Sequence, residues 1–326
     1  MACYHPLKGF DTGTLTINNK PKYIIKPYDS VLYNIDGTEM DFIEIPCGRC
    51  IGCRLAYSRM WADRCMAEAT LHDESYFVTL TYDPDHVPYC IDQETGEIGK
   101  YQTLVKRDCQ LFMKRLRKNY KYDNKIRFFL AGEYGLQTAR PHYHVILFGL
   151  KLDDLVFYKK TPLGFNLYTS EFLNSVWNYQ GYVIVAEVTW ETCAYTARYI
   201  MKKQTGTASE FYEELNIQQE FTLMSRKPGI AKDFYDQHKL ELLKYREVDI
   251  STQKGGRKIR SVKYFDKFLD IDYPEEREEI KSNLKKQMEV IKAKKLENTS
   301  LSYMEMLEVS EDIKINRIKK LPRKEI

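Results

Sequence analysis

A short apolar segment with two histidines constrains the fold of this chain more than any other feature. Residues 140–149 read Arg-Pro-His-Tyr-His-Val-Ile-Leu-Phe-Gly, and their β-branched and aromatic side chains predict a strand. Pro141 stands at its first position, where a missing backbone N–H is tolerated. Because strand side chains alternate between faces, His142 and His144 point the same way and can share one cation. The alternative is that one imidazole packs and the other is hydrogen-bonded.

The segments around this strand predict a mixed α+β domain. Composition predicts strands at 76–82, 126–131, 142–148 and 182–188, and apolar spacing predicts helices at 55–70, 103–119, 170–177 and 191–203. Residues 132–135 form the turn of a hairpin between the second and third strands. The order β, α, β, β, α, β resembles the split βαβ arrangement, so we expect an antiparallel sheet of about four to five strands with flanking helices.

The chain of 326 residues is long enough for one large domain or two smaller ones. We expect three segments. Residues 1–72 form a cysteine-rich and helical extension packed on the core, and residues 73–245 form the core itself. Residues 246–326 are charged and mainly helical, because Lys and Glu alternate with scattered Ile, Leu and Met from Pro274 onward.

The predicted hairpin brings a carboxylate to the two histidines. Glu133 ends the strand that pairs with theirs. A carboxylate beside two imidazoles forms a three-point metal site with positions open for substrate or water. A glutamate at a turn is usually solvated, so the prediction that Glu133 is a ligand depends on the hairpin.

Two tyrosines on the helix at 191–203 are candidate nucleophiles. Tyr195 and Tyr199 are spaced i, i+4, which puts both hydroxyls on one face, and Lys202 lies one turn beyond Tyr199. A tyrosine with a pKa of about 10 is a weak nucleophile at neutral pH, and a nearby cation or metal would favour its phenolate. The alternative is that these tyrosines only pack, since the chain has 25 of them.

Four cysteines near the N-terminus predict a structural zinc site. Cys47, Cys50 and Cys53 form two overlapping Cys-x-x-Cys pairs, and zinc needs a fourth ligand. Cys3 fits that role better than Cys65, which lies on the apolar side of a predicted helix. An iron–sulfur cluster is the alternative, but the fourth cysteine of the ferredoxin run is missing. The remaining interpretation is that these cysteines are free thiols.

Basic and aromatic residues indicate a nucleic-acid partner. The net charge of +4 proves little, but one segment, 106–121, concentrates seven Lys and Arg residues with a single acid, Asp108. Phosphate contacts from such residues position a strand without reading its sequence. The candidates are Lys114, Arg115, Arg117 and Lys118, with a weaker second group at Lys254, Arg257, Lys258 and Arg260.

No apolar run approaches the roughly 20 residues of a membrane span, and Met1 to Pro6 lack the pattern of a signal peptide. We therefore expect a globular protein of the cytoplasm that does not bind membranes. In that reducing compartment, eight cysteines are thiols or metal ligands rather than disulfides.

In combination, these motifs resemble those of the HUH replication endonucleases. A strand like 77–81, a His-hydrophobic-His strand and a Tyr-x-x-x-Tyr-x-x-Lys helix occur in the order of that family's three motifs. Gly132-Glu133-Tyr134-Gly135 and Pro46-Cys47-Gly48-Arg49-Cys50 are similar to the initiators of small single-stranded DNA phages, the gokushovirus branch of the Microviridae. The resemblance covers roughly residues 1–235.

The resemblance implies an RRM-like or ferredoxin-like HUH core and a metal-dependent nickase and strand transferase. A tyrosine would attack the viral origin on single-stranded or supercoiled DNA, keep the 5′ phosphate and free a 3′ hydroxyl, in the cytoplasm of a bacterial host with a host helicase or polymerase. The family's tyrosines map onto Tyr195 and Tyr199, its lysine onto Lys202, and its metal histidines onto His142 and His144. Glu133 corresponds to the third ligand of related viral initiators.

The sequence alone leaves open which metal ion binds and to which functional class the protein belongs. Two imidazoles lean toward Mn²⁺, whereas Mg²⁺ prefers all-oxygen ligands, so the ion at the His/His/Glu site is Mg²⁺ or Mn²⁺. A transposase or relaxase uses the same chemistry, and a non-catalytic, zinc-stabilised nucleic-acid-binding protein is a further alternative. An iron oxygenase shares the ligand triad but normally draws it from a β-barrel, which this chain does not predict.

Overall fold

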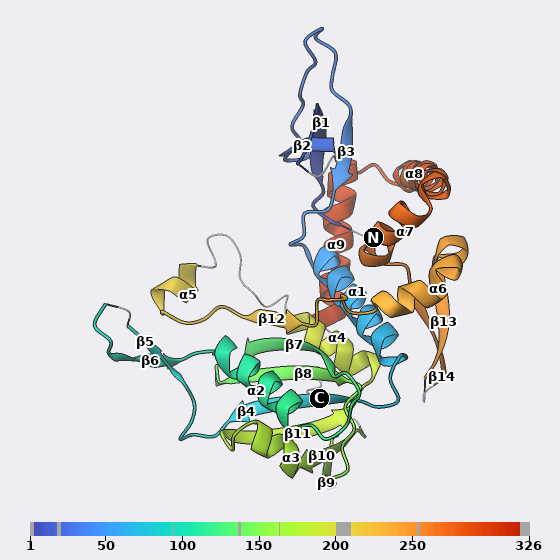
Figure 1. Cartoon of the computed structure of the whole chain (residues 1–326). Helices are drawn as coiled ribbons and strands as arrows, with labels where there is room; N and C mark the ends of the chain where they lie inside the picture. Colours follow the sequence, from blue (N-terminus) through green and yellow to red (C-terminus); the bar gives the residue numbers. More distant parts are fainter. Residues whose placement is uncertain are drawn as a thin grey trace. The chain divides into compact units, whose positions relative to one another are not determined.

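The computed structural model describes residues 3–17, 21–92, 94–135, 138–162, 164–199, 210–252 and 255–319, with only the backbone of Arg198 and Tyr199. The chain forms two compact units. One comprises Met1–Tyr57 with Glu278–Arg323, and the other comprises Ser58–Arg277. Each unit is described separately below (Figure 1).

An antiparallel sheet forms the centre of the second unit. Its inner strands run in the order β7-β8-β4-β11, so the first and third strands of the βαββαβ series are the central pair. This confirms the predicted α+β class and the predicted hairpin. The elements of the series are β4 (Ser75–Tyr82), α2 (Lys106–Asn119), β7 (Arg127–Tyr134), β8 (Pro141–Phe148), α3 (Glu171–Val176) and β11 (Gly181–Glu187).

The sheet is larger than the predicted four to five strands. Its described part has seven, because β12 (Phe221–Met224) adds to β7, and β10 (Asn166–Ser170) and β9 (Leu155–Lys160) add beyond β11. The sequence pattern predicts no strand between residues 148 and 170. β9 is the edge strand and is mostly exposed, and β10 pairs beside it, so neither carries the alternating apolar pattern by which a half-buried strand is recognised.

The sheet has a hydrophobic core on each face, because alternate side chains of its strands point to opposite sides. On one face, Val78 and the other side chains on that face pack against α2 and α3, where Phe112 and Trp177 are fully buried. Phe77 and Phe129 point the other way, toward α1 (Ile51–Ala69) and α4 (Trp190–Tyr199). Burial of each such large apolar side chain stabilises the fold by about 1.5–3 kcal/mol. Helices on both faces are visible in Figure 1.

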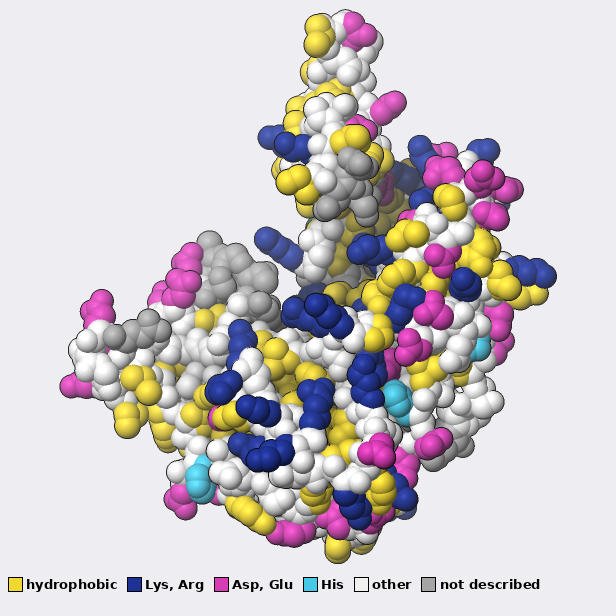
Figure 2. Space-filling view, viewed as in Figure 1, with side chains coloured by type: hydrophobic (Ala, Val, Ile, Leu, Met, Phe, Trp, Pro, Cys, Tyr) yellow, Lys and Arg dark blue, Asp and Glu magenta, His cyan; other side chains and the backbone are white. Residues whose placement is uncertain are grey.

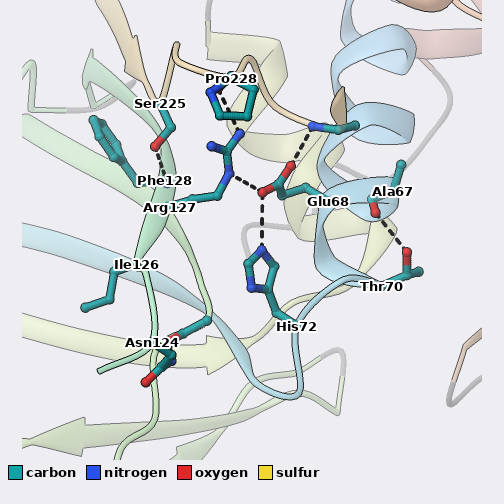
Figure 3. Close-up of polar contacts among 12 residues, drawn as sticks. Ala67, Glu68, Thr70, His72, Asn124, Ile126, Arg127, Phe128, Ser225 and Pro228 are labelled. Atoms are coloured by element: carbon teal, nitrogen blue, oxygen red, sulfur yellow. Dashed lines mark hydrogen bonds and ion pairs between the residues drawn. The ribbon is translucent and has the colours of Figure 1, made fainter. Parts of the chain in front are cut away.

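A buried charged network joins α1 to β7 (Figure 3). The Arg127 guanidinium donates to the Glu68 carboxylate, and the side chains are 6% and 2% exposed, respectively. Glu68 also accepts from the Ala231 N–H and contacts His72 Nε2 at 3.2 Å, while Arg127 donates to the Pro228 carbonyl at 3.1 Å. The network therefore fixes α1, one central strand and the turn before α6 to one another.

The remaining elements of the second unit surround this sheet. A second, two-stranded sheet pairs β13 with β14, and its inner residues Val248 and Ile259 share the core of α6 and α7. A third sheet is the hairpin β5-β6. These elements are β5 (Tyr89–Ile91), β6 (Ile98–Gln102), α5 (Glu210–Glu214), α6 (Lys232–Tyr245), β13 (Glu247–Thr252), β14 (Gly255–Arg260) and α7 (Lys263–Asp272).

The first unit combines an N-terminal sheet with the C-terminal helices. Its strands β1 (Leu7–Leu15), β2 (Pro21–Lys26) and β3 (Phe42–Ile45) pair in the order β2-β1-β3, and α8 (Pro274–Glu297) and α9 (Tyr303–Lys319) contribute most of the rest. Lys292 of α8 pairs with Glu44 of β3 at 2.7 Å, and Tyr303 of α9 donates to the same carboxylate. The helices predicted beyond Pro274 are present. Among the described helices, none has the length and apolar character to cross a membrane.

Candidate functional site

The β7–β8 hairpin places the predicted ligands on one face of the sheet. Glu133 is the register partner of His142, and Ala131 is the partner of His144. On the other side of β8, Thr79 of β4 pairs with His144. Directly opposed residues share a face, and this face is the one that α1 and α4 cover.

His144 and Glu133 are in direct contact. His144 Nε2 lies 2.9 Å from Glu133 Oε1, and the two residues are only 5% and 3% exposed. His144 Nδ1 lies 3.2 Å from Thr79 Oγ1, so both ring nitrogens have a partner. The Phe77 ring stacks on the imidazole with centroids 5.6 Å apart. These contacts fix the ring in its plane and aim Nε2 at the carboxylate.

His142 lies beside this pair without joining it. Its Nδ1 is buried without a hydrogen-bond partner among the described residues. Burial, followed by the nearby charge of His144, lowers the pKa of His142, so the imidazole is neutral at neutral pH and keeps a lone pair. In the described part of the chain, only the cysteine set below brings three or more His, Cys, Asp or Glu ligand atoms within 4.8 Å of one another. His142 therefore stands outside the contact between His144 and Glu133.

Tyr195 packs directly against the histidine site. Its ring meets the His144 imidazole edge-on, with centroids 5.2 Å apart, and lies 6.3 Å from the Phe77 ring. Tyr199 ends α4, and its side chain is outside the described structure. Lys202 also lies outside the described residues. The structure thus brings one of the two predicted nucleophiles to the predicted ligands.

Three neighbours of the site carry no signal in the sequence alone. Thr79 is one of many strand threonines until the register places it at His144. Arg140 precedes the strand and donates to the Tyr82 carbonyl at 2.6 Å, while its Nε is buried without a partner among the described residues. A Cβ added at Gly135 would come within 2.9 Å of His142 Nε2. The absence of a side chain at residue 135 leaves room for this imidazole.

The four cysteines predicted as ligands form one cluster in the first unit. The sulfurs of Cys3, Cys47, Cys50 and Cys53 all lie within 4.8 Å of one another, so the set could hold a metal ion. The alternative ligand, Cys65, is fully buried among apolar side chains beside α4. A tetrahedral zinc with Zn–S bonds of about 2.3 Å needs sulfurs about 3.8 Å apart, and Cys3 Sγ and Cys50 Sγ are 4.0 Å apart.

Backbone N–H groups point at these sulfurs as they do in thiolate metal sites. The Tyr4 N–H donates to Cys50 Sγ at 3.3 Å, and the Cys47 N–H donates to Cys3 Sγ at 3.2 Å. Burial acts to raise the pKa of Cys50, but N–H bonds from Tyr4 and Cys53 outweigh it and lower this pKa to about 7. Gly48, with φ of +76°, allows the turn between Cys47 and Cys50.

The basic helix lies on the opposite face from the histidines. Figure 2 shows Lys and Arg side chains gathered over α2, whose buried side joins the core of the other sheet face. Two of the four residues predicted to contact DNA also donate hydrogen bonds to backbone carbonyls. The Arg115 Nε donates to the Val176 carbonyl at 2.7 Å, and the Arg117 guanidinium covers the Phe128 ring and donates to the Ile126 carbonyl. Lys114 and Lys118 are exposed.

Comparisons with known proteins assign these motifs to a class, the replication-associated proteins of phages. The family model for the ORF2 type of replication-associated protein matches residues 75–204, which begin with β4 and include both histidines and α4. The replication-associated protein ORF2 of Spiroplasma virus 4 is 30% identical over 282 residues, which is 85% of this chain and 82% of that protein. The chain belongs to this family of replication-associated proteins.

Two further relatives agree. The replication-associated protein VP4 of Bdellovibrio phage phiMH2K is 33% identical over 62% of this chain and 58% of its own length. The replication-associated protein ORF4 of Chlamydia phage 1 is 34% identical over 49% of this chain and 38% of its own length. The resemblance to phage replication proteins of the Microviridae type is therefore confirmed. No solved structure matches the chain.

Proposed function

We propose that this protein initiates rolling-circle replication of a small phage by nicking single-stranded DNA at the viral origin with a tyrosine. The observation that supports this most is the contact between His144 and Glu133, with Tyr195 packed on the same imidazole, in a phage replication-associated protein. Its partner would be the single-stranded or supercoiled viral origin in the cytoplasm of the bacterial host. A host helicase or polymerase would extend the freed end.

His144, Glu133 and His142 would hold the catalytic ion. Two donors bound to one octahedral ion at about 2.1 Å are about 3 Å apart, which agrees with the 2.9 Å between His144 Nε2 and Glu133 Oε1. The proton on His144 Nδ1 is then donated to Thr79 Oγ1, which leaves the Nε2 lone pair for the metal. His142, which is half-buried, would complete the set by a rotation of its neutral ring. Bound Mg²⁺ or Mn²⁺ would draw charge from a non-bridging oxygen of the scissile phosphate.

The tyrosine would perform the transfer itself. The phenolate oxygen of Tyr195 or Tyr199 forms a bond to phosphorus, the bond from phosphorus to the 3′ oxygen breaks, and that oxygen leaves as a 3′ hydroxyl after taking a proton. The phosphate then stays on the tyrosine as a 5′-phosphotyrosine. A second tyrosine one helical turn away permits a second transfer that rejoins the strand after one round. Lys202, one turn beyond Tyr199, would favour the phenolate.

The positively charged residues would divide between the two faces. Arg140 lies next to His142 and has a buried guanidinium nitrogen without a partner in the described structure, which suits a phosphate at the reaction centre. Lys114 and Lys118 lie on the opposite face of the sheet, so they would hold DNA away from the scissile phosphate. Arg115 and Arg117 each donate to a backbone carbonyl, so we assign them a role in the stability of the fold in addition to any contact with DNA.

We also propose that the cysteine set binds a structural zinc ion. The four sulfurs, the N–H groups that point at them and the spacing of Cys3 from Cys50 support this. The described part of the first unit has one cluster of buried residues, Tyr4 with Cys50 and Cys53. A unit with so small an apolar core depends on cross-links or metals for its stability.

The decisive experiment is a covalent-adduct assay. Purified protein is incubated with a labelled single-stranded origin oligonucleotide from its own genome and Mn²⁺ or Mg²⁺, and denaturing electrophoresis detects labelled protein. We expect an adduct with the wild-type chain and none when Tyr195→Phe and Tyr199→Phe are combined. Tyr245→Phe, at an exposed position of α6, is the matched control. An adduct that survives the double substitution would overturn the proposed nucleophiles.

A second candidate function, DNA binding without catalysis, is favoured by one observation. Tyr195 is part of the packing of Phe77 and His144, as a purely structural tyrosine would be. The same assay separates the two functions, because a non-catalytic protein shifts the oligonucleotide in a native gel but leaves no label after denaturation.

A further inference from the structure

A pocket lies at the N-terminal end of α4, where the helix begins at Trp190. It has a volume of about 830 Å³ and opens between the start of β4, the end of β11, the first residues of α4 and the β13–β14 hairpin. This volume is within the range of ligand sites, roughly 300–1,000 Å³. All of its lining residues belong to the second unit.

Trp190 and Arg257 form a stacking platform in this pocket. The Arg257 guanidinium lies 4.4 Å from the centre of the Trp190 ring, and the Trp190 N–H donates to Asp63 at 2.8 Å, which fixes the indole. Among the described residues, no hydrogen bond or ion pair to the Arg257 side chain is found. Arg257 shares the inner face of the hairpin with Ile259, whereas Lys258 points to solvent. A guanidinium that lies over an indole ring is a surface on which nucleobases stack.

The charged side chains around the platform are mainly carboxylates. Four carboxylates line the pocket against the single cation Arg257, so a phosphate would be repelled. Their donor atoms form no set within 4.8 Å in the described part of the chain, which makes a metal site unsuitable. Ser75 Oγ is buried there without a described partner. Carboxylates accept from the amino groups of cytosine, adenine and guanine. The carboxylates are Asp73, Glu74, Glu187 and Glu191.

The pocket is connected to the histidine site by one strip of the sheet. Ala186 lines the pocket, and Ile184 and Tyr182 lie on the same face of β11. They oppose Phe77, Thr79 and Thr81 of β4 in that order, so the strip runs from the pocket toward the histidines. Tyr182 is 63% exposed. Trp190 and Tyr195 are five residues apart on α4, about 7.5 Å along the axis, or about two nucleotides of a stacked strand.

We propose that this pocket holds one unpaired, amino-bearing base of the DNA strand, within about two nucleotides of the scissile phosphate. The proposal rests on the single-stranded substrate proposed above and deepens it, since it assigns a place where the origin sequence is read. The base stacks on Arg257 and its amino group donates to the carboxylates. The basic residues of α2 hold the backbone without such selectivity.

Abasic scanning combined with one substitution tests this proposal. Oligonucleotides with a single abasic site at each position around the nick are bound to the full chain without added Mn²⁺ or Mg²⁺, and affinity is measured by fluorescence anisotropy. At one position, we expect the abasic site to weaken wild-type binding by roughly 5- to 100-fold. In Arg257→Gln, the same abasic site should cost less than about twofold, because the stacking surface is already lost.

Lys258→Gln is the matched control, since it removes the same charge from the same strand outside the pocket. It should weaken binding equally at all positions and keep the wild-type abasic profile. If the profile of Arg257→Gln equals that of the wild type, no base occupies the pocket. If thymine at the sensitive position binds as well as the other three bases, the amino-group selectivity is wrong. The covalent-adduct assay is independent, so a nicking enzyme without a base pocket and a base pocket without nicking give different results.

Discussion

Replacement of Glu68 by Gln should destabilise the second unit strongly. Glu68 accepts three donors, from Arg127, His72 and the Ala231 N–H, and is 2% exposed. Gln keeps the size but removes the charge, and its amide nitrogen faces groups that are themselves donors. Removal of one partner of a buried ion pair leaves an unpaired buried charge, here Arg127, and costs about 3–5 kcal/mol.

Urea unfolding followed by tryptophan fluorescence measures this cost. The three tryptophans of the chain, Trp61, Trp177 and Trp190, all lie in the second unit, so their emission reports on that unit. With an m-value of about 3 kcal/mol per molar urea, the midpoint should fall by about 1–1.7 M. Glu241→Gln, which breaks an exposed pair with His238 on α6, should cost at most about 1 kcal/mol.

The effect should also depend on pH. Burial acts to raise the pKa of Glu68, but hydrogen bonds from His72 and the Ala231 N–H, together with Arg127, outweigh it and lower this pKa below its usual value. The ionised carboxylate therefore stabilises the fold above the unfolded pKa of about 4.3, and this stabilisation is lost as pH falls through the folded pKa. The difference between wild type and Glu68→Gln should shrink below about pH 4. A loss under 1 kcal/mol at pH 7, or a constant difference down to pH 3, would refute the reasoning.

Four further substitutions test the proposed zinc site, the proposed metal site and the roles of the basic residues of α2. Cys50→Ser should remove the zinc measured by elemental analysis of the purified chain, and zinc retained at full stoichiometry would contradict the cysteine site. Gly135→Ala should weaken Mn²⁺ binding in calorimetry with an unchanged melting temperature, because the added Cβ would lie 2.9 Å from His142 Nε2 and displace the ring. Lys114→Gln should reduce the salt dependence of DNA binding by about one unit of slope. Arg115→Gln should instead lower the melting temperature, since it loses a bond to a backbone carbonyl; equal effects of the two would contradict this division.

The sequence predicts those parts of the fold in which the local residue pattern and the pairing of neighbouring segments indicate the same structure. The β-branched and aromatic residues of 142–148, the preceding strand and the short turn predicted the β7–β8 hairpin, and the register then placed Glu133 opposite His142. The spacing of Cys47, Cys50 and Cys53 predicted the cysteine cluster. Cys3 joins it while Cys65 is in the core, as its place on an apolar helix face predicted.

Other features depend on tertiary contacts that leave no local pattern. The edge strand β9 pairs through its backbone while its side chains face solvent, so its residues need not alternate. Arg115 and Arg117 read as surface charges, and only the packing of α2 shows that both reach backbone carbonyls. Thr79 and the pocket at Arg257 likewise depend on which strands meet.

The alternation of side chains along the strands explains why the proposed reaction centre and the basic helix lie on opposite faces of the sheet. His144 and Tyr143 are adjacent, yet the first contacts Tyr195 on one face while the second is buried with Trp177 on the other. A one-residue slip of β8 would exchange them and remove the proposed metal ligand His144 from α4. The core itself opposes that slip, because Phe77 and Ile146 on one face, and Val145 and Leu147 on the other, are buried. The packing that stabilises this sheet therefore also sets the geometry of the proposed site, and a DNA substrate would reach that site along the face of α4 rather than across α2.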